Sequence, residues 1–333
     1  MPWTCRIFGL GVEIDRPLAA LAGLPEAGRV DVRVGLGALP PGHDDGGTWH
    51  PHGDGPSGFE EPDALVRAAR HAVSGHYRLR YADETVFVID SRGERVWGTW
   101  PSGHTVEDAA TYLLGPVFGF VLRLRGTASL HASVVAIDGR AIVLASHAGG
   151  GKSSTAAGFA LAGFPVMSDD IAALDEAAGE ILVRPAYPRV RLWRESVKSL
   201  FGDADALPPI SPSWDKCHLS LGGQAPFGSE RLPLDCVYFL DDRVAQAAPR
   251  FARMDSREGL VWLLGHTYVN YLLDKRMRAA EFELLSRVAT TVPLVRVSAA
   301  DDMGRVGDLC RALAVDARTR RAARGRRAQH AAV

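Results

Sequence analysis

One stretch of the chain decides the expected fold: Ser146-His147-Ala148-Gly149-Gly150-Gly151-Lys152-Ser153. An apolar run at Ala141–Ala145 precedes it, and a helical pattern at Lys152–Gly163 follows it. In this order of strand, glycine-rich loop and helix, the pattern G-x-x-x-x-G-K-[ST] binds phosphates through backbone N–H groups and a helix N-terminus. Ser146 replaces the first glycine of the pattern but keeps its own N–H. We therefore predict a phosphate-binding loop, with a glycine-rich turn and a chance lysine as the alternative.

The lysine of the stretch is unusual in this chain, because almost every other basic residue is arginine. The remaining lysines are Lys198, Lys216 and Lys275. In loops of this type the lysine reaches the outer phosphates and the hydroxyl after it binds magnesium. The nucleotide-binding residues predicted from the stretch are Ser146, His147, Ala148, Gly149, Gly150, Gly151, Lys152, Ser153 and Ser154.

Two adjacent carboxylates, Asp169 and Asp170, follow the short apolar run Phe164–Met167. If that run is a strand of a parallel sheet, the carboxylates lie at its carboxyl edge beside the glycine-rich loop, where open α/β sheets bind ligands. One carboxylate can then belong to a metal shell while the other accepts a hydroxyl proton. A solvated turn is the alternative.

The chain before the loop is expected to form a smaller α+β domain. We expect an edge strand in Cys5–Ile14, a short helix at Leu18–Leu24 and a long buried helix at Val106–Leu124. Three short runs separated by polar turns predict an antiparallel meander; they are Tyr77–Tyr81, Thr85–Ile89 and Arg95–Trp100.

A loop rich in Gly, His, Asp and Pro is expected at Pro40–Asp63. It contains residues that offer a metal site as a minor alternative to a solvated loop; they are His43, Asp44, Asp45, His50, His52 and Asp54.

After the loop, a hairpin is predicted from Ser133–Ile137 and Ala141–Ala145, which flank a turn at Asp138 and Gly139. Strands are expected at Ile181–Val183, Val190–Trp193, Val237–Leu240 and Leu294–Val297, and helices at Arg194–Leu200, Arg257–Met277 and Ala279–Ala289. Six arginines from Arg318 to Arg327 predict a frayed helical or a disordered basic tail rather than a nucleic-acid arm.

Composition describes a soluble globular protein, since 47% of its 333 residues are apolar and 23% are charged. With a net charge of −1, no global field attracts nucleic acid or an anionic membrane. The longest apolar stretch, Leu113–Leu122, is too short to span a bilayer. The cysteines form no C-x-x-C pair, which argues against a zinc cluster or a disulfide scaffold and favours a cytoplasmic location; they are Cys5, Cys217, Cys236 and Cys310.

Three motifs in order resemble the catalytic domain of HPr kinase/phosphorylase and its stand-alone relatives. They are Leu130–Ala136 with His131, the glycine-rich loop, and Ser168-Asp169-Asp170. The resemblance covers Thr127–Leu174 and thins out afterwards. It implies a P-loop domain akin to phosphoenolpyruvate carboxykinase at residues 126–315, preceded by an N-terminal domain at 1–125 and followed by the tail at 316–333.

The resemblance also implies roles for single residues. Lys152 would steady the β- and γ-phosphates of ATP, and Ser153 would ligate Mg²⁺ with Asp170 near the metal. Asp169 would take the proton from the acceptor hydroxyl, and His131 would orient or polarise Asp169. Such an enzyme works mostly by positioning and charge neutralisation.

The expected activity is transfer of the γ-phosphoryl group to a serine or other hydroxyl of a peptide or small protein. The Arg6–Leu10 segment resembles HPr-kinase-related proteins of peptide-tailoring gene sets, which suggests an acceptor other than HPr. No glutamate signature aligns with Ile181–Trp193, which argues against phosphorylase activity. Arg189, Arg191 and Lys216 are either phosphate or substrate contacts or surface charges.

Two other activities stay open: a small-molecule kinase that uses the same site, and a nucleotide-binding regulatory protein without transfer. The second needs only the loop, so His131 and Asp169 argue against it. Because family enzymes are often hexamers, the resemblance also allows a homo-oligomer.

Overall fold

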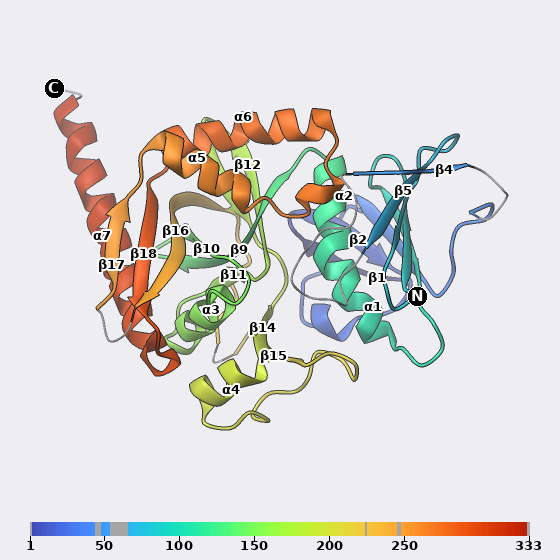
Figure 1. Cartoon of the computed structure of the whole chain (residues 1–333), viewed down its shortest axis with the longest axis horizontal. Coiled ribbons are helices and arrows are strands. Elements are labelled where there is room, and N and C mark those ends of the chain that lie inside the picture. The colour runs from blue at the N-terminus through green and yellow to red at the C-terminus, as the bar shows by residue number, and fades with distance from the viewer. Residues whose placement is uncertain (1, 44–47, 54–65, 224, 245–247, 332–333) are drawn as a thin grey trace. The chain divides into compact units, whose positions relative to one another are not determined.

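The computed structural model describes residues 2–43, 48–53, 66–223, 225–244 and 248–331. Within them the chain forms two compact units that mix helices with sheets, in agreement with the expected α/β class (Figure 1). Unit 1 comprises Met1–Ser129, Pro209–Asp215 and Thr267–Leu284. Unit 2 comprises Leu130–Pro208, Lys216–His266 and Leu285–Val333. The units are therefore not consecutive in the chain, because two later segments belong to unit 1.

Unit 1 contains an eight-stranded sheet with the order β1-β2-β3-β8-β7-β6-β5-β4. Its strands are β1 (Trp3–Ile7), β2 (Leu10–Ile14), β3 (Val32–Leu36), β4 (Trp49–Pro51), β5 (Arg67–His71), β6 (Tyr77–Arg80), β7 (Val86–Ile89) and β8 (Arg95–Thr99). Its helices are α1 (Val106–Tyr112) and α2 (Phe118–Leu124), with 3₁₀ turns at Ala19–Leu21 and Asn270–Leu272. The antiparallel pairing of β6, β7 and β8 confirms the expected meander.

Two expected elements of unit 1 differ in the structure. Cys5–Ile14 is a hairpin of β1 and β2 rather than one strand, because Phe8 and Gly9 both have positive φ and reverse the chain. The helix expected at Val106–Leu124 is interrupted by a π turn at Leu113–Val117. Pro116 lacks an N–H and Gly115 has a non-helical conformation, which explains the kink.

The loop expected at Pro40–Asp63, for which a metal site was the minor alternative, is described only in part. Asp44, Asp45 and Asp54 lie outside the described residues. The ring of His52 packs against Tyr77, and its Nε2 lies 2.9 Å from the carbonyl oxygen of Leu272.

Unit 2 contains a second eight-stranded sheet and a separate two-stranded one, β14-β15. The strands of the large sheet are β9 (Ala128–Ile137), β10 (Arg140–Ala145), β11 (Val166–Ser168), β12 (Ile171–Ala177), β13 (Glu180–Arg184), β16 (Leu232–Val244), β17 (Arg250–Arg253) and β18 (Leu294–Ala300). The small sheet pairs β14 (Arg189–Trp193) with β15 (Lys216–Ser220). The helices are α3 (Lys152–Leu161), α4 (Arg194–Phe201), α5 (Ser256–Gly265) and α7 (Val306–Ala331), and α6 (Lys275–Thr291) runs from unit 1 into unit 2.

The large sheet is mixed rather than parallel, which corrects the expectation for the strand before the acidic pair. β10, β16 and β18 are parallel, whereas β9 is antiparallel to both β10 and β11. β11 therefore runs in the direction of β10 although β9 separates them. The ends of both strands pair with the middle of β9, since Ala145 lies opposite Ala132 and Ser168 opposite Val134. The loop and the acidic pair thus share one sheet edge, as expected, through a different topology.

The hairpin of β9 and β10 forms as the sequence predicts. Asp138 and Gly139 have φ of +49° and +73°, and a two-residue turn of this kind matches the twist of paired strands. The register places Ile137 opposite Arg140, so no residue is inserted between strand and turn. This hairpin carries the end of β10 to the start of the glycine-rich loop.

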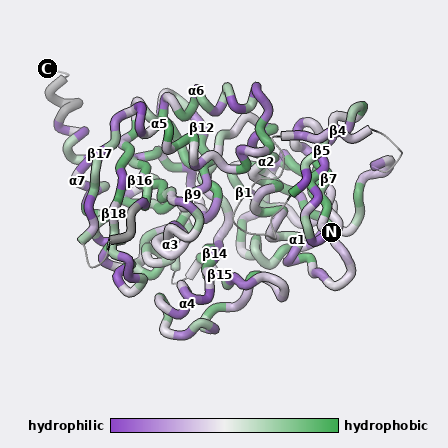
Figure 2. The backbone as a smooth tube through the Cα atoms, viewed as in Figure 1, coloured by the Kyte–Doolittle hydropathy of each residue, from purple (hydrophilic) through white to green (hydrophobic). Residues whose placement is uncertain are grey.

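Helices α3 and α7 pack together on one face of the large sheet. Figure 2 shows α3 in pale colours, since Ser, Ala and Gly of intermediate hydropathy make up most of it. Small residues let α7 approach closely: a Cβ at Gly158 would lie only 2.7 Å from Val306 and 3.0 Å from Cys310. α5 packs on the other face, because Phe239, which alternates with the core residue Tyr238, contacts Trp262.

Two helical expectations are corrected near the C-terminus. The pattern at Arg257–Met277 contains a break at residues 266–274, where Val269 adopts a left-handed conformation and Asp274 receives the N–H of Met277. The basic tail belongs to α7, so of the two forms expected for it the helical one is present and the disordered one is corrected. Arg321 and Arg324 bind the buried carboxylate of Asp235, which anchors this part of the helix.

The described part of the chain contains no helix that is both long and apolar enough to cross a membrane.

Candidate functional site

The glycine loop, residues 146–151, connects β10 to α3. Gly149 and Gly151 have φ of +73° and +91°, a left-handed conformation that other residues rarely adopt. Gly150 is required by space instead, because a Cβ there would lie 2.6 Å from the Cβ and Oγ of Ser146. Left-handed glycines next to a helix start are typical of loops whose N–H groups form anion-binding concavities. Gly149 and Gly151 therefore adopt conformations that other residues avoid, as expected, and phosphate binding by the loop stays a prediction.

Lys152 begins α3, and its side chain folds back over the loop. The residue is 7% exposed, and its Nζ donates to the carbonyl of Ser146 at 3.0 Å with a longer 3.5 Å contact to that of His147. Burial lowers the pKa of Lys152, while the nearby carboxylates of Asp170 and Asp169 oppose this effect. The lysine is thus a buried cation between the loop and the acidic pair.

Asp169 joins three parts of unit 2. Its Oδ1 accepts hydrogen bonds from the hydroxyls of Ser133 on β9 and Ser153 on α3, at 2.7 and 2.9 Å. Its Oδ2 accepts one from the backbone N–H of Arg191 on β14, at 2.9 Å. The residue is only 4% exposed, and these donors compensate for its burial. The carboxylate is therefore fixed next to the hydroxyl predicted to bind magnesium.

Asp170 points to a different partner. Its Oδ1 lies 3.1 Å from Nδ1 of His131, and its carbonyl accepts the N–H of Ala132. Asp170 has a φ of +75°, an uncommon conformation that Asp tolerates better than most residues. The resemblance implied that His131 acts on Asp169; the structure instead pairs His131 with Asp170.

The residues fit a magnesium ion and a phosphate chain in their donor chemistry. Magnesium prefers oxygen ligands, and protein sites commonly supply one or two carboxylates that act together with substrate phosphates. The hydroxyl of Ser153 and the carboxylate of Asp169 provide such oxygens side by side. Among the described residues, no group of three or more His, Cys, Asp or Glu side chains could hold a metal ion by itself.

The three additional cations named from the sequence have different surroundings. Arg191 binds Asp169 through its backbone, and its side chain donates to the hydroxyl of Tyr187 at 2.9 Å. Nζ of Lys216 lies 4.2 Å from the ring centre of Trp193, its partner across β14 and β15. Arg189 lies at the start of β14, opposite Ser220.

Sequence reasoning missed two residues of the site. Ser133 could have been found, because it follows His131 by two positions on one strand and therefore shares its face. His266 carried no such signal. It comes from the end of α5, and its carbonyl accepts the N–H of His131 at 2.7 Å.

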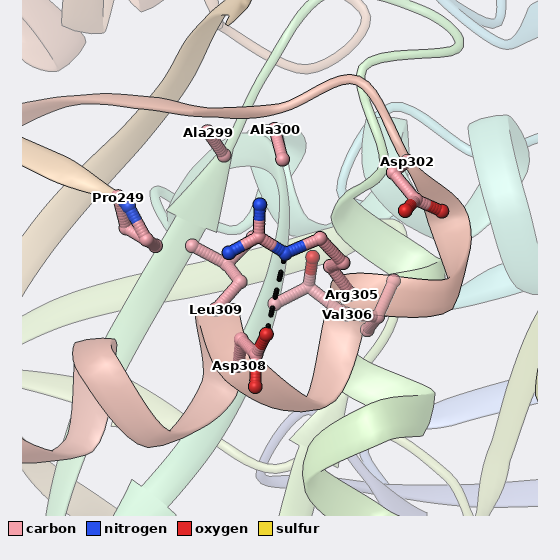
Figure 3. A pocket seen from close by; sticks show the side chains of 9 residues that line it. Pro249, Ala299, Ala300, Asp302, Arg305, Val306, Asp308 and Leu309 are labelled. Atoms are coloured by element: carbon pink, nitrogen blue, oxygen red, sulfur yellow. Dashed lines mark hydrogen bonds and ion pairs between the residues drawn. The ribbon is translucent and has the colours of Figure 1, made fainter. Parts of the chain in front are cut away.

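Unit 2 also contains a hollow that these residues do not line (Figure 3). It is formed mainly by the end of β18 and the start of α7, and its lining residues are Thr155, Pro249, Ala299, Ala300, Asp302, Arg305, Val306, Asp308 and Leu309. Arg305 is bound to Asp308 at 3.3 Å within it. None of the site residues predicted from the sequence lines this hollow.

No protein-family model matches the chain, and no curated protein matches it. Among solved structures, the HPr(Ser) kinase/phosphatase from Coxiella burnetii is similar over 61% of this chain and 96% of that chain. The two share 13% identical residues with a TM-score of 0.34. A similarity at this level does not assign a function to the chain.

Proposed function

We propose that unit 2 binds ATP with Mg²⁺ and transfers the γ-phosphoryl group to a hydroxyl of a peptide or small protein. One observation carries the proposal: Lys152, the Ser153–Asp169 pair and the His131–Asp170 pair meet at a single sheet edge beside the glycine loop. Lys152 supplies a cation for the phosphates, Ser153 and Asp169 supply oxygen ligands for a metal, and Asp170 supplies a proton acceptor. Phosphoryl transfer needs these three functions.

The chain's own residues divide the work. The glycine loop and Lys152 hold the phosphates, and Ser153 with Asp169 would hold Mg²⁺, which supplies charge neutralisation when bound. Asp170 accepts the proton of the acceptor hydroxyl, and His131 keeps its carboxylate in place. The acceptor oxygen forms a bond to the γ-phosphorus as the bond to the β–γ bridging oxygen breaks, and ADP leaves with that electron pair. This assignment exchanges the roles that the resemblance gave to Asp169 and Asp170.

A nucleotide-binding protein without transfer is the main competitor. Binding alone requires the loop and its lysine, whereas it gives no use to a carboxylate in a left-handed conformation held against a histidine. Uncommon conformations of this kind persist where the surrounding structure imposes them, and they gather at functional sites. The His131–Asp170 pair therefore favours transfer.

The first experiment is a calorimetric titration of ATP with and without magnesium. The proteins compared are the wild type, Lys152→Ala, and Lys198→Ala as a matched control on the exposed face of α4. Lys152→Ala should weaken ATP binding at least about tenfold, because one hydrogen bond to a charged group is lost. Lys198→Ala should bind as the wild type does.

Binding that depends on both magnesium and Lys152 supports the nucleotide site. Transfer is then measured with ATP labelled in its γ-phosphoryl group and a library of serine-containing peptides. If the wild type binds no ATP, or if Lys152→Ala binds it unchanged, the proposed function is wrong.

A further inference from the structure

The outer end of the glycine loop carries a histidine whose side chain has no assigned task. The lysine of such a loop reaches the outer phosphates, and Lys152 Nζ lies against the carbonyls of Ser146 and His147. The first residues of the loop therefore flank the position of the terminal phosphoryl group rather than that of the base. His147 is exposed there, and among the described residues its ring nitrogens make no hydrogen bond.

Helix α5 holds the ring of His147 in place from one side. The ring centre of His147 lies 5.4 Å from that of His266 and 6.2 Å from that of Trp262. Trp262 and His266 are themselves nearly parallel, with an angle of 10° between their rings. Trp262 and His266 therefore both pack against the ring of His147.

His266 contains a buried nitrogen without a partner. The residue is 5% exposed, and its Nδ1 lies 2.8 Å from the carbonyl of Trp262, to which it must donate. Nε2 is then an acceptor, and among the described residues it has no hydrogen-bond partner. Burial lowers the pKa of His266 to about 4, and the nearby charges of His147, Lys152 and His131 act in the same direction.

A neutral, buried acceptor stabilises a donor that can reach it, since an unsatisfied buried polar atom costs about 1–3 kcal/mol. His147 is a neighbouring side chain with an N–H to offer, since its ring centre lies 5.4 Å from that of His266. With both ring nitrogens protonated, His147 has one N–H for Nε2 of His266 and a second for a phosphate oxygen.

We propose that His147 donates a hydrogen bond to the γ-phosphoryl group of the nucleotide and that His266 is the positioning residue that orients it. The inference rests on the proposed nucleotide site. It assigns to His147 the distinction between triphosphate and diphosphate, because ADP lacks the group that His147 contacts.

The test compares the affinities of a non-hydrolysable ATP analogue and of ADP, measured by calorimetry with magnesium present. His147→Ala should weaken binding of the ATP analogue about tenfold, which is the loss of one charge-assisted hydrogen bond, and leave the ADP affinity within about twofold of the wild type. His266→Phe, which keeps a ring against Trp262, should lose part of the same preference. His76→Ala, which removes a partly buried histidine of unit 1, is the control and should keep both affinities.

Three outcomes overturn the inference. Equal losses for both nucleotides in His147→Ala would mean that His147 only shapes the loop or meets another part of the nucleotide. Unchanged affinities would mean that it has no contact, and an unchanged preference in His266→Phe would remove the positioning role. Inorganic tripolyphosphate separates these failures from failure of the site itself: if the wild type binds neither tripolyphosphate nor either nucleotide, the proposed function falls with the inference.

Discussion

Two buried carboxylates, one in each unit, are satisfied in nearly the same way. Asp108 in unit 1 is 2% exposed and accepts hydrogen bonds from Ser211, Ser213 and both the N–H and the hydroxyl of Thr105. Asp169 in unit 2 is 4% exposed and accepts two serine hydroxyls and one backbone N–H. Their own hydrogen bonds do not tell a structural carboxylate from a functional one.

The residues around the two carboxylates do distinguish them. The donors to Asp108 fix the first turn of α1, where Thr105 caps the helix, and the segment Pro209–Asp215. Beside Asp169 lie the buried cation Lys152, the glycine loop and the strained Asp170. A carboxylate that only joins segments needs hydrogen-bond donors. A carboxylate that takes part in a reaction also needs a cation, a glycine-rich loop or a side chain that can accept a proton nearby.

The largest expected effect concerns transfer of the γ-phosphoryl group. Asp170→Asn should slow transfer from labelled ATP about 10²- to 10⁴-fold, the usual contribution of a general base, while magnesium-dependent ATP binding persists. Asp169→Asn should instead weaken the magnesium dependence of binding, because one oxygen ligand loses its charge. Asp108→Asn should change neither property. Titration calorimetry and a labelled-phosphate assay measure both.

The opposite pattern is equally specific. If Asp169→Asn keeps magnesium-dependent binding and loses transfer, while Asp170→Asn affects the metal, the roles implied by the resemblance hold. In that case the His131–Asp170 contact is structural. If Asp108→Asn also abolishes transfer, the comparison between the two carboxylates fails.

The sequence predicted the local parts of the candidate site. The turn at Asp138 and Gly139, the glycines of the loop and the helical pattern after Lys152 are all signals within a few residues. Each was sufficient for its element because backbone conformation and short-range hydrogen bonds decide it. The alternation of residues along β9 places Ser133 on the same face as His131. Its role as a hydrogen-bond donor becomes visible only once the fold brings Asp169 next to it.

The parts that could not be predicted depend on residues distant in the chain. Which strands of the large sheet run parallel depends on β16 and β18, which lie about ninety to one hundred and fifty residues beyond β10. The partner of His131 depends on the positive φ of Asp170, and no sequence pattern indicated that conformation. Asp108 carried no signal beyond its place near the start of the helix expected at Val106–Leu124, since its contacts with Ser211 and Ser213 arise from folding.

Acid should remove the contribution of Asp108 to stability. Burial opposes its charge, but the hydrogen bonds from Ser211, Ser213 and Thr105 lower the pKa of Asp108 to about 2 in the folded protein. Because the folded pKa lies below the unfolded value, the contribution of about 2 kcal/mol is present above pH 4 and is lost as the pH falls from 4 to 2. The free energy of unfolding of the wild type minus that of Asp108→Asn measures it.

That difference should be largest near neutral pH and shrink at pH 3, as denaturant titrations at each pH can record. A difference that stays constant between pH 6 and pH 3 would show that the charge of Asp108 does not stabilise unit 1. Nucleotide affinity at neutral pH serves as the control, and it should match the wild type.

The smallest expected effects come from a matched pair of hydroxyl deletions, Ser133→Ala and Ser211→Ala. Each removes one hydrogen bond to a carboxylate that keeps other donors, so each should lower the free energy of unfolding by only about 1 kcal/mol. Ser133→Ala should also weaken magnesium-dependent ATP binding about fivefold, because Asp169 is held less firmly beside Ser153. Ser211→Ala should leave that binding unchanged. The two variants are then equal in stability and different in affinity; equal affinities would mean that Asp169, like Asp108, serves only to join its segments.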